Sequence, residues 1–293
     1  MPLNFAVFKV RALTALVFVI VMVSGLLINE WSFFLLFTII HFGCWFEYQK
    51  LIGLISPEYN QIMDFHRYGI MLLGWGFMMW MTNTDYYIGN IQLSETGWWL
   101  MLILTFTMPV AELLLGKHLN LKNIGYSLFG LLYISLCWGL MMDLRSEGII
   151  AFGGVFKFDL GWVLPAVMIA SIWINDTMAY IVGSFIGKTP FSSISPKKTW
   201  EGTAGGAILC IIVIGLLGTF IPVAQQVAPI HWFVIAAICA IFGTAGDLLE
   251  SKIKRMADVK DSGSFMPGHG GFLDRFDSLL VAAPLVWIYV TFF

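Results

Sequence analysis

Apolar residues run along this chain in long, nearly unbroken blocks, and short polar stretches separate the blocks. A helix that crosses a membrane needs about 20 mostly apolar residues, and about nine blocks approach that length. The pattern predicts an all-α polytopic membrane protein with about nine transmembrane helices. The expected spans are 12–29, 31–46, 68–82, 98–115, 124–142, 160–184, 204–225, 230–248 and 279–293. The shorter apolar run 149–158 is expected to lie at the membrane surface.

Composition agrees with this pattern. The 293 residues are 59% hydrophobic and only 12% charged, whereas charged residues make up about 25% of an average soluble domain. The four cysteines all lie in apolar runs and none has CxxC spacing, so neither a zinc site nor a disulfide framework is predicted. No small-x-small cleavage site follows the first apolar run, which we therefore interpret as a retained first helix.

The basic residues indicate an orientation. Cytoplasmic loops of membrane proteins carry most of the Lys and Arg. With nine spans and a cytoplasmic N-terminus, all but two of the 16 basic residues lie on the inner side, and the exceptions are Arg145 and Lys157. The loop 83–97, on the outer side, has no cation. We expect one integral membrane domain over residues 1–293, with N-terminal helices in 1–160 and catalytic helices and loops in 161–293.

Polar motifs crowd the second half of the chain, so the active site is expected at the cytoplasmic ends of the C-terminal helices. Asp176 lies inside an apolar segment, where a carboxylate is costly and usually has a partner or a function. Pro196 ends any helix and is followed by Lys197 and Lys198 in "SPKKTWEG". The small residues of "GTAGGA" then allow a ligand or a neighbouring backbone to come close, and a helix start attracts anions.

Two acidic pairs follow. Asp247 and Glu250 are spaced i,i+3 at the inner end of the eighth span, and Asp274 and Asp277 repeat this spacing at the start of the ninth. Residues so spaced share one helix face. Clustered carboxylates suit Mg²⁺, which takes one or two carboxylates together with phosphate oxygens and water.

The stretch between these pairs, "SKIKRMADVKDSGSFMPGHGGFLDRFDS", is basic and rich in glycine. Cations interleaved with metal ligands are typical of a site for a polyphosphate, because both neutralise charge on the leaving group. The glycines of "PGHGGF" permit turns with N–H groups free to face phosphate, and His269 in that turn is a candidate to bond a phosphate or act as an acid, with a purely structural histidine as the alternative. A merely solvated inner loop explains the cations but not the acidic pairs or the glycine turn.

This stretch resembles the signature of the phosphatidate cytidylyltransferases, the CDP-diacylglycerol synthases. The matching positions are Ser251, Ile253, Lys254, Arg255, Lys260, Asp261, Gly263, Pro267, His269, Gly270, Gly271, Phe272, Asp274, Arg275, Phe276 and Asp277. Met266 stands where the family usually has Leu, Ile or Phe. "SPKKTWEG" and the pattern at Asp176, Ala179, Tyr180 and Gly183 are also similar to that family. The first half is similar only in hydropathy, so it adds nothing to the case for this function.

The resemblance implies that CTP and phosphatidic acid give CDP-diacylglycerol and pyrophosphate, with Mg²⁺ and possible K⁺ as a second metal, in a homodimer. The implied location is a bacterial cytoplasmic membrane with the site facing the cytoplasm, and no nucleic-acid partner is expected. Expected catalytic residues are Lys197, Lys198, Lys260, His269 and Arg275. Expected substrate-binding residues are Asp176, Ser195, Lys254, Arg255, Gly270 and Gly271. Expected metal ligands are Asp247 and Asp274 first, then Asp277 and Glu250.

Two other readings stay open on the sequence. One keeps CTP but changes the acceptor, as in a CTP-dependent polyprenol or phytol kinase or a transferase for an ether-lipid phosphate. The other is an ion or anion carrier, although a carrier places its ionisable residues near the midplane, whereas here they gather at the inner helix ends. Glu112, alone in its apolar run, is expected to make a structural hydrogen bond or a dimer contact.

Overall fold

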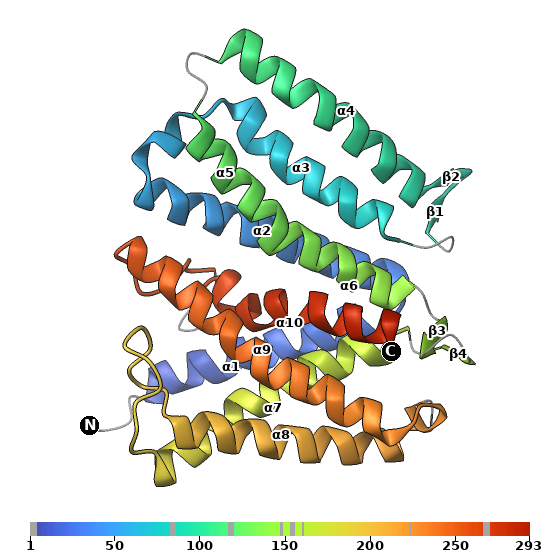
Figure 1. The fold of residues 1–293 in the computed structure, drawn as a ribbon, viewed down its shortest axis with the longest axis vertical. Helices are drawn as coiled ribbons and strands as arrows, with labels where there is room; N and C mark the ends of the chain where they lie inside the picture. The colour runs from blue at the N-terminus through green and yellow to red at the C-terminus, as the bar shows by residue number, and fades with distance from the viewer. Residues whose placement is uncertain are drawn as a thin grey trace. The chain divides into compact units, whose positions relative to one another are not determined.

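The computed structural model describes residues 5–82, 86–116, 120–146, 149–152, 156–159, 161–222, 224–265 and 270–293. Helices dominate this part of the chain (Figure 1). The α-helices are α1 (Phe5–Leu27), α2 (Glu30–Ile55), α3 (Asp64–Trp80), α4 (Leu93–Leu115), α5 (Leu121–Gly130), α6 (Leu136–Ser146), α7 (Val163–Ile186), α8 (Trp200–Phe220), α9 (Pro229–Met256) and α10 (Leu273–Phe292). Shorter helical turns are η1 (Pro57–Gln61), the π-helical η2 (Leu131–Ser135) and η3 (Ala224–Gln226). The strands are β1 (Tyr87–Ile88), β2 (Ile91–Gln92), β3 (Ile149–Phe152) and β4 (Phe156–Asp159).

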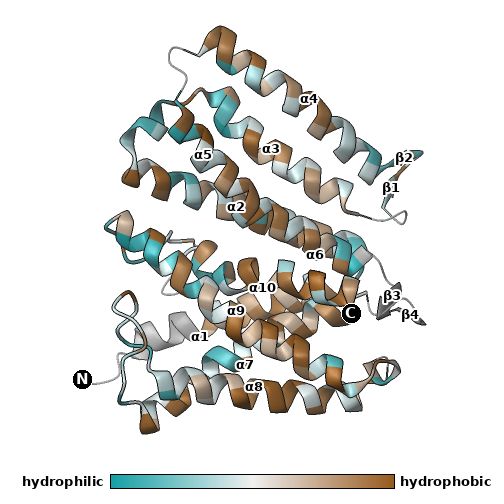
Figure 2. Ribbon diagram, in the orientation of Figure 1, coloured by the Kyte–Doolittle hydropathy of each residue, from teal (hydrophilic) through white to brown (hydrophobic). Residues whose placement is uncertain are grey.

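Within the described residues, six helices are long and apolar enough to cross a membrane by length and composition. They are Leu93–Leu115, Leu121–Arg145, Val163–Ile186, Trp200–Phe220, Pro229–Met256 and Leu273–Phe292. Hydrophobic residues cover the lengths of these helices, and hydrophilic residues collect at several helix ends and in the loops (Figure 2). The prediction of an all-α membrane protein is therefore confirmed.

Two segments show how local structure departs from the simplest expectation. The expected span 124–142 is one run of α5, η2 and α6, in which five residues form a π-helical turn. Ser135, the last of them, accepts a hydrogen bond from the indole of Trp45 on α2 at 2.9 Å. The run 149–158 contains no spanning helix: β3 and β4 form an antiparallel hairpin in which Ile149 pairs with Asp159.

The chain divides into two compact units. The first comprises Met1–Gly139 together with Ile253–Phe276, and the second comprises Leu140–Lys252 together with Asp277–Phe293. Most of the basic, glycine-rich stretch thus belongs to the same unit as the N-terminal helices. The division of the chain into catalytic and non-catalytic parts near residue 160 stays a prediction.

Aromatic side chains form the core of the first unit. Trp138 is fully buried, and its ring lies 5.1 Å from that of Phe37 on α2. The same indole meets Phe276 of α10 edge-on, with ring centroids 5.7 Å apart. Aromatic pairs at such separations prefer offset or edge-to-face arrangements. This core ties the first turn of α10 to α2 and α6.

In the second unit α7 packs along α8. A Cβ atom added at Gly206 would lie 2.7 Å from the backbone nitrogen of Ala179 on α7, so only glycine permits this close approach. The small residues of "GTAGGA" therefore make room for a neighbouring backbone, which is one of the two roles expected for them.

Candidate active site

Residues 187–199, which we name the lysine loop, lead from α7 to α8. The two arms of the loop meet where the N–H of Phe191 donates to the carbonyl of Lys198 at 2.8 Å. Thr199 caps α8 by accepting from the N–H of Gly202 at 3.1 Å. These contacts hold Lys197 and Lys198 directly in front of the start of α8.

Glu201 ties the other end of the lysine loop to α8. Its carboxylate accepts hydrogen bonds from the N–H of Lys188 at 3.2 Å and from the N–H and hydroxyl of Thr189 at 3.1 and 2.7 Å. The sequence analysis gave Glu201 no role. An acidic residue in the first turn of a helix is a recognised signal for contacts with free N–H groups, and it could have been used here.

The lysine loop contacts α9 through an ion pair between Lys198 and Asp247. About a quarter of each side chain is exposed, 27% for Lys198 and 26% for Asp247. The hydroxyl of Ser251, one turn further along α9, donates to the other oxygen of Asp247 at 3.3 Å. Two clusters that the sequence marked separately, "SPKKTWEG" and "GTAGDLLES", therefore meet.

The remaining acidic partners lie deeper in the second unit. Glu250 is fully buried on α9, and Asp277 is 9% exposed near the start of α10. The N–H of Ser278 donates to Asp277 at 2.6 Å. Neither side chain lies at the surface, so each faces protein rather than water.

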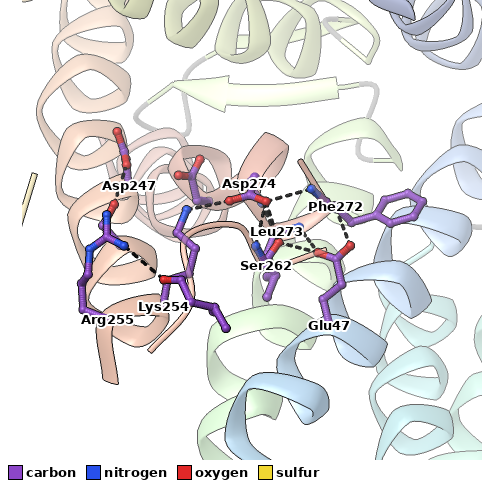
Figure 3. Close-up of polar contacts among 12 residues, drawn as sticks. Glu47, Asp247, Lys254, Arg255, Ser262, Phe272, Leu273 and Asp274 are labelled. Atoms are coloured by element: carbon purple, nitrogen blue, oxygen red, sulfur yellow. Dashed lines mark hydrogen bonds and ion pairs between the residues drawn. The ribbon is translucent and has the colours of Figure 1, made fainter. Parts of the chain in front are cut away.

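Asp274, on the first turn of α10, accepts four hydrogen bonds (Figure 3). One oxygen pairs with the ammonium of Lys254 at 2.6 Å. The other accepts from the N–H and hydroxyl of Ser262, both at 2.9 Å, and from the N–H of Gly271 at 2.8 Å. Only 8% of the Asp274 side chain is exposed. Asp274 thus connects the end of α9, through Lys254, with the loop before α10, through Ser262 and Gly271.

Glu47 of α2 completes this network, and the sequence analysis missed it. Its carboxylate accepts from the N–H groups of Phe272 and Leu273, both at 2.9 Å, and from the hydroxyl of Ser262 at 2.7 Å (Figure 3). The first N–H groups of a helix have no partner within the helix, and Glu47 supplies one for the start of α10. Through Glu47, the first half of the chain, to which the sequence assigned no role, contacts the signature stretch.

Two glycines of the signature have different structural reasons. Gly270 has φ +83°, a left-handed conformation that favours glycine, and a Cβ there would lie 2.5 Å from Asp274. A Cβ at Gly271 would collide with the carboxylate of Glu47. The N–H of Gly271 is bonded to Asp274, so this N–H serves the protein's own carboxylate.

The other residues expected at the site are distributed around these two clusters. The carbonyl of Ser195 accepts from the N–H of Lys198 at 3.1 Å, and the guanidinium of Arg255 donates to the carbonyl of Val259 at 3.1 Å. The exposed side chains among them are those of Asp176, Lys197, Arg255, Lys260 and Arg275. His269 lies outside the described residues.

No three His, Cys, Asp or Glu side chains gather into a metal-binding group in the described parts of the chain. A site that draws only one or two carboxylates from the protein is what Mg²⁺ uses when phosphate oxygens and water complete its shell. Asp247 and Asp274 each offer hard carboxylate oxygens, and they pair with the ammonium groups of Lys198 and Lys254 respectively.

Comparison with known proteins identifies the family. Residues 9–293 match the cytidylyltransferase family. The chain is 32% identical to the phosphatidate cytidylyltransferase of Bacillus subtilis over 228 residues, which cover 77% of this chain and 78% of that protein. It is 30% identical to the Staphylococcus saprophyticus enzyme of the same name over 284 residues, which cover 95% of this chain and 97% of that protein. A chloroplastic Arabidopsis thaliana relative is 34% identical, over 70% of this chain and 54% of the longer plant protein.

The match extends over nearly the whole chain, so it includes the N-terminal helices as well as the two charged clusters. The clusters combine carboxylates with lysines at the ends of apolar helices, which is the chemistry that a nucleotide and an anionic lipid require. This chain belongs to the cytidylyltransferase family of membrane nucleotidyltransferases.

Proposed function

We propose that this protein is a phosphatidate cytidylyltransferase, which converts CTP and phosphatidic acid into CDP-diacylglycerol and pyrophosphate. One structural observation carries the proposal beyond family membership. The two leading acidic residues, Asp247 and Asp274, each form an ion pair with a lysine, Lys198 and Lys254 respectively. Alternating carboxylates and ammonium groups suit a polyphosphate that arrives with a divalent cation.

The reaction joins the lipid phosphate to the nucleotide. An oxygen of phosphatidate attacks the α-phosphorus of CTP, and the bond to the oxygen that bridges the α- and β-phosphorus atoms breaks. Pyrophosphate leaves with that oxygen. The nucleophile is already an anion near neutral pH, so the protein has no need of a strong general base. Its task is to position the two substrates and to balance charge.

Cations from both clusters are assigned to the phosphates. The proposed phosphate-contacting residues are Lys197, Lys198, Lys260, His269 and Arg275. The proposed nucleotide- or lipid-binding residues are Asp176, Ser195, Lys254, Arg255, Gly270 and Gly271. The exposure of Lys197, Lys260 and Arg275 supports this assignment, because these side chains are available to a ligand that comes from water.

The proposed cofactor is Mg²⁺, with K⁺ as a second metal. Asp247 and Asp274 are the proposed primary ligands, with Asp277 and Glu250 supporting them. The Asp274 oxygen that pairs with Lys254 is the proposed metal ligand, because the other oxygen already accepts three hydrogen bonds. When bound, the metal would neutralise charge on the transferred and leaving phosphates.

The proposed membrane arrangement has nine spans, a cytoplasmic N-terminus and the site on the cytoplasmic side, in the inner membrane of a bacterium. The distribution of Lys and Arg supports this orientation. A homodimer is the proposed assembly.

The deciding experiment incubates the purified protein with radiolabelled CTP, phosphatidic acid and Mg²⁺. Label carried in the cytidine should appear in a lipid, with one pyrophosphate released per lipid formed. A CTP-dependent lipid kinase would instead transfer the γ-phosphate and release CDP. Replacing phosphatidic acid by an ether-linked lipid phosphate or by a polyprenol separates the acceptors. Absence of cytidine-labelled lipid with phosphatidic acid would reject the proposal.

A further inference from the structure

We propose that Glu47 is a positioning residue for the transfer reaction: it fixes the first turn of α10 and, through that turn, Asp274. The inference rests on the proposed function, in which Asp274 binds the metal. It assigns a role at the active site to a residue of α2, in the half of the chain where the sequence gave no sign of chemistry.

The contacts place Glu47 directly against the segment that carries Asp274. Helix α10 begins at Leu273, and Asp274 is its second residue. The N–H groups that donate to Glu47 belong to Phe272 and Leu273, the two residues immediately before Asp274. A carboxylate that accepts backbone N–H groups makes charge-assisted hydrogen bonds, which are roughly twice as strong as neutral ones. Displacing Glu47 therefore releases the peptide groups that orient Asp274.

Glu47 and Asp274 also share a hydrogen-bond donor. The Ser262 hydroxyl lies 2.7 Å from an oxygen of Glu47 and 2.9 Å from an oxygen of Asp274. A hydroxyl has one hydrogen to donate, so it serves one carboxylate at a time. The two acidic side chains are consequently coupled, and a change at one alters the hydrogen bonding of the other.

The glycines around Glu47 give independent support. A Cβ at Gly263 or Gly271 would collide with the Glu47 carboxylate, and the three nearest atoms in each case all belong to Glu47. Among the described glycines, positive φ occurs only at Gly89 and Gly270, so backbone conformation does not demand glycine at either position. Glycine is needed at Gly263 and Gly271 because any larger residue would occupy the space of the Glu47 carboxylate. Gly263 and Gly271 thus both leave room for the same side chain of α2, that of Glu47.

The first test compares Glu47→Gln with Glu112→Gln, which alters another carboxylate within a helix of the same unit. Hydrogen exchange measured by mass spectrometry should become faster in peptides covering residues 262–276 for Glu47→Gln only. Exchange reports local opening and requires neither metal nor substrate. The Mg²⁺ concentration for half-maximal activity should rise about 10- to 100-fold, the range for residues that orient metal ligands, and excess Mg²⁺ should restore most of kcat.

The outcomes separate positioning from general stability and from the proposed function. A loss of kcat with unchanged Mg²⁺ dependence would mean a structural role and overturn the inference. Unchanged exchange in residues 262–276 would overturn it as well. If the wild-type protein makes no CDP-diacylglycerol, the proposed function fails, and the exchange result still shows whether Glu47 holds the start of α10.

A second test uses the steric match between Glu47 and Gly271. Gly271→Ala should lower kcat/KM by about 10- to 100-fold, because the new methyl group displaces the carboxylate. In a Glu47→Ala background the same substitution should have little further effect, which is the non-additivity expected of residues in contact. If Gly271→Ala does not fold, recovery of folded, monodisperse protein in the double variant is the equivalent readout. Additive losses, or a double variant no better folded than Gly271→Ala, would contradict the proposed contact.

Discussion

Each leading carboxylate of the site is held by a lysine from a different segment of the chain. Asp247 pairs with Lys198 of the lysine loop, and Asp274 pairs with Lys254 of α9. Such pairs are poor evidence for stability, because removing charges from water costs nearly as much as the attraction returns. Their presence at helix ends beside exposed cations therefore points to a role in binding anions.

Asp274→Asn keeps the size of the side chain and removes its charge. We expect activity to fall by at least about 100-fold, since a proposed metal ligand should matter no less than the residues that orient it. CDP-diacylglycerol formation across a Mg²⁺ titration is the measurement. Asp258→Asn is the control in the same loop, because Asp258 is exposed and has φ +53°, a conformation that asparagine also adopts. Normal turnover of Asp274→Asn at low Mg²⁺ would refute the metal assignment.

Glu112 illustrates an ionisable residue with a structural partner. Its carboxylate lies 3.3 Å from Nδ1 of His66, whose Nε2 lies 2.9 Å from the Ser127 hydroxyl. One of the two contacts expected for Glu112, a hydrogen bond, is present, and its purely structural role stays a prediction. We predict that Glu112→Gln retains activity within about twofold and lowers the free energy of unfolding by about 0.5–1.5 kcal/mol, the range for one hydrogen bond. A loss of activity as large as that of Asp247→Ala would place Glu112 in the site instead.

The sequence singled out charged residues of the candidate site more readily than the partners they contact. Lys198 and Asp247 were both singled out, but their pairing depends on how the lysine loop folds against α9. Glu47 was missed for a specific reason: the expected second span ended at residue 46, whereas α2 continues to Ile55. A carboxylate inside a spanning helix is a candidate by default, and Glu47 fell just outside the range in which that rule was applied.

At the scale of elements, the lysine loop shows how a helix start organises an irregular segment. Thr199 caps α8, and Glu201 collects the N–H groups of Lys188 and Thr189 from the opposite arm. The loop is therefore held where it joins α8, next to Lys197, which is exposed, and Lys198, which pairs with Asp247.

Glu201→Gln should loosen the base of the loop and lower kcat/KM for CTP by about 10-fold, at the lower end of the range for residues that support a site. The melting temperature should change little, because the substitution loosens only the loop. Glu95→Gln is the control, since Glu95, like Glu201, lies in the first turn of a helix, here α4. Equal kinetics for Glu201→Gln and the wild-type protein would show that the loop does not depend on Glu201.

The apolar pattern predicted helices well and their ends less well. Each expected span falls on a helix or on the continuous run from α5 to α6. The helices α2 and α9 extend to Ile55 and Met256, beyond the apolar blocks, because backbone hydrogen bonds continue past the depth at which hydropathy changes. The π-helical turn and the β3–β4 hairpin left no mark on the apolar pattern, since both depend on contacts distant in sequence or on local backbone geometry.

For the molecule as a whole, topology is the feature to test. Cysteines placed at Ser264 and Asn90 should react with a membrane-impermeant reagent from opposite sides, with Ser264 on the cytoplasmic side. Both positions are exposed, whereas Ser262, in the same loop, is buried against Glu47 and Asp274 and would be a poor reporter. The four native cysteines are all buried, which keeps background labelling low. Labelling of both sites from one side would contradict the nine-span arrangement.

The pairing of each leading carboxylate with a lysine also bears on how the protein is made. A newly inserted chain meets no substrate and no guaranteed supply of divalent ions, and an isolated buried carboxylate would oppose its assembly. Lys198 and Lys254 act as built-in counter-ions for Asp247 and Asp274. With these counter-ions in place, folding should not depend on the proposed metal, and we expect chelators added during purification to leave an intact protein rather than an unfolded one.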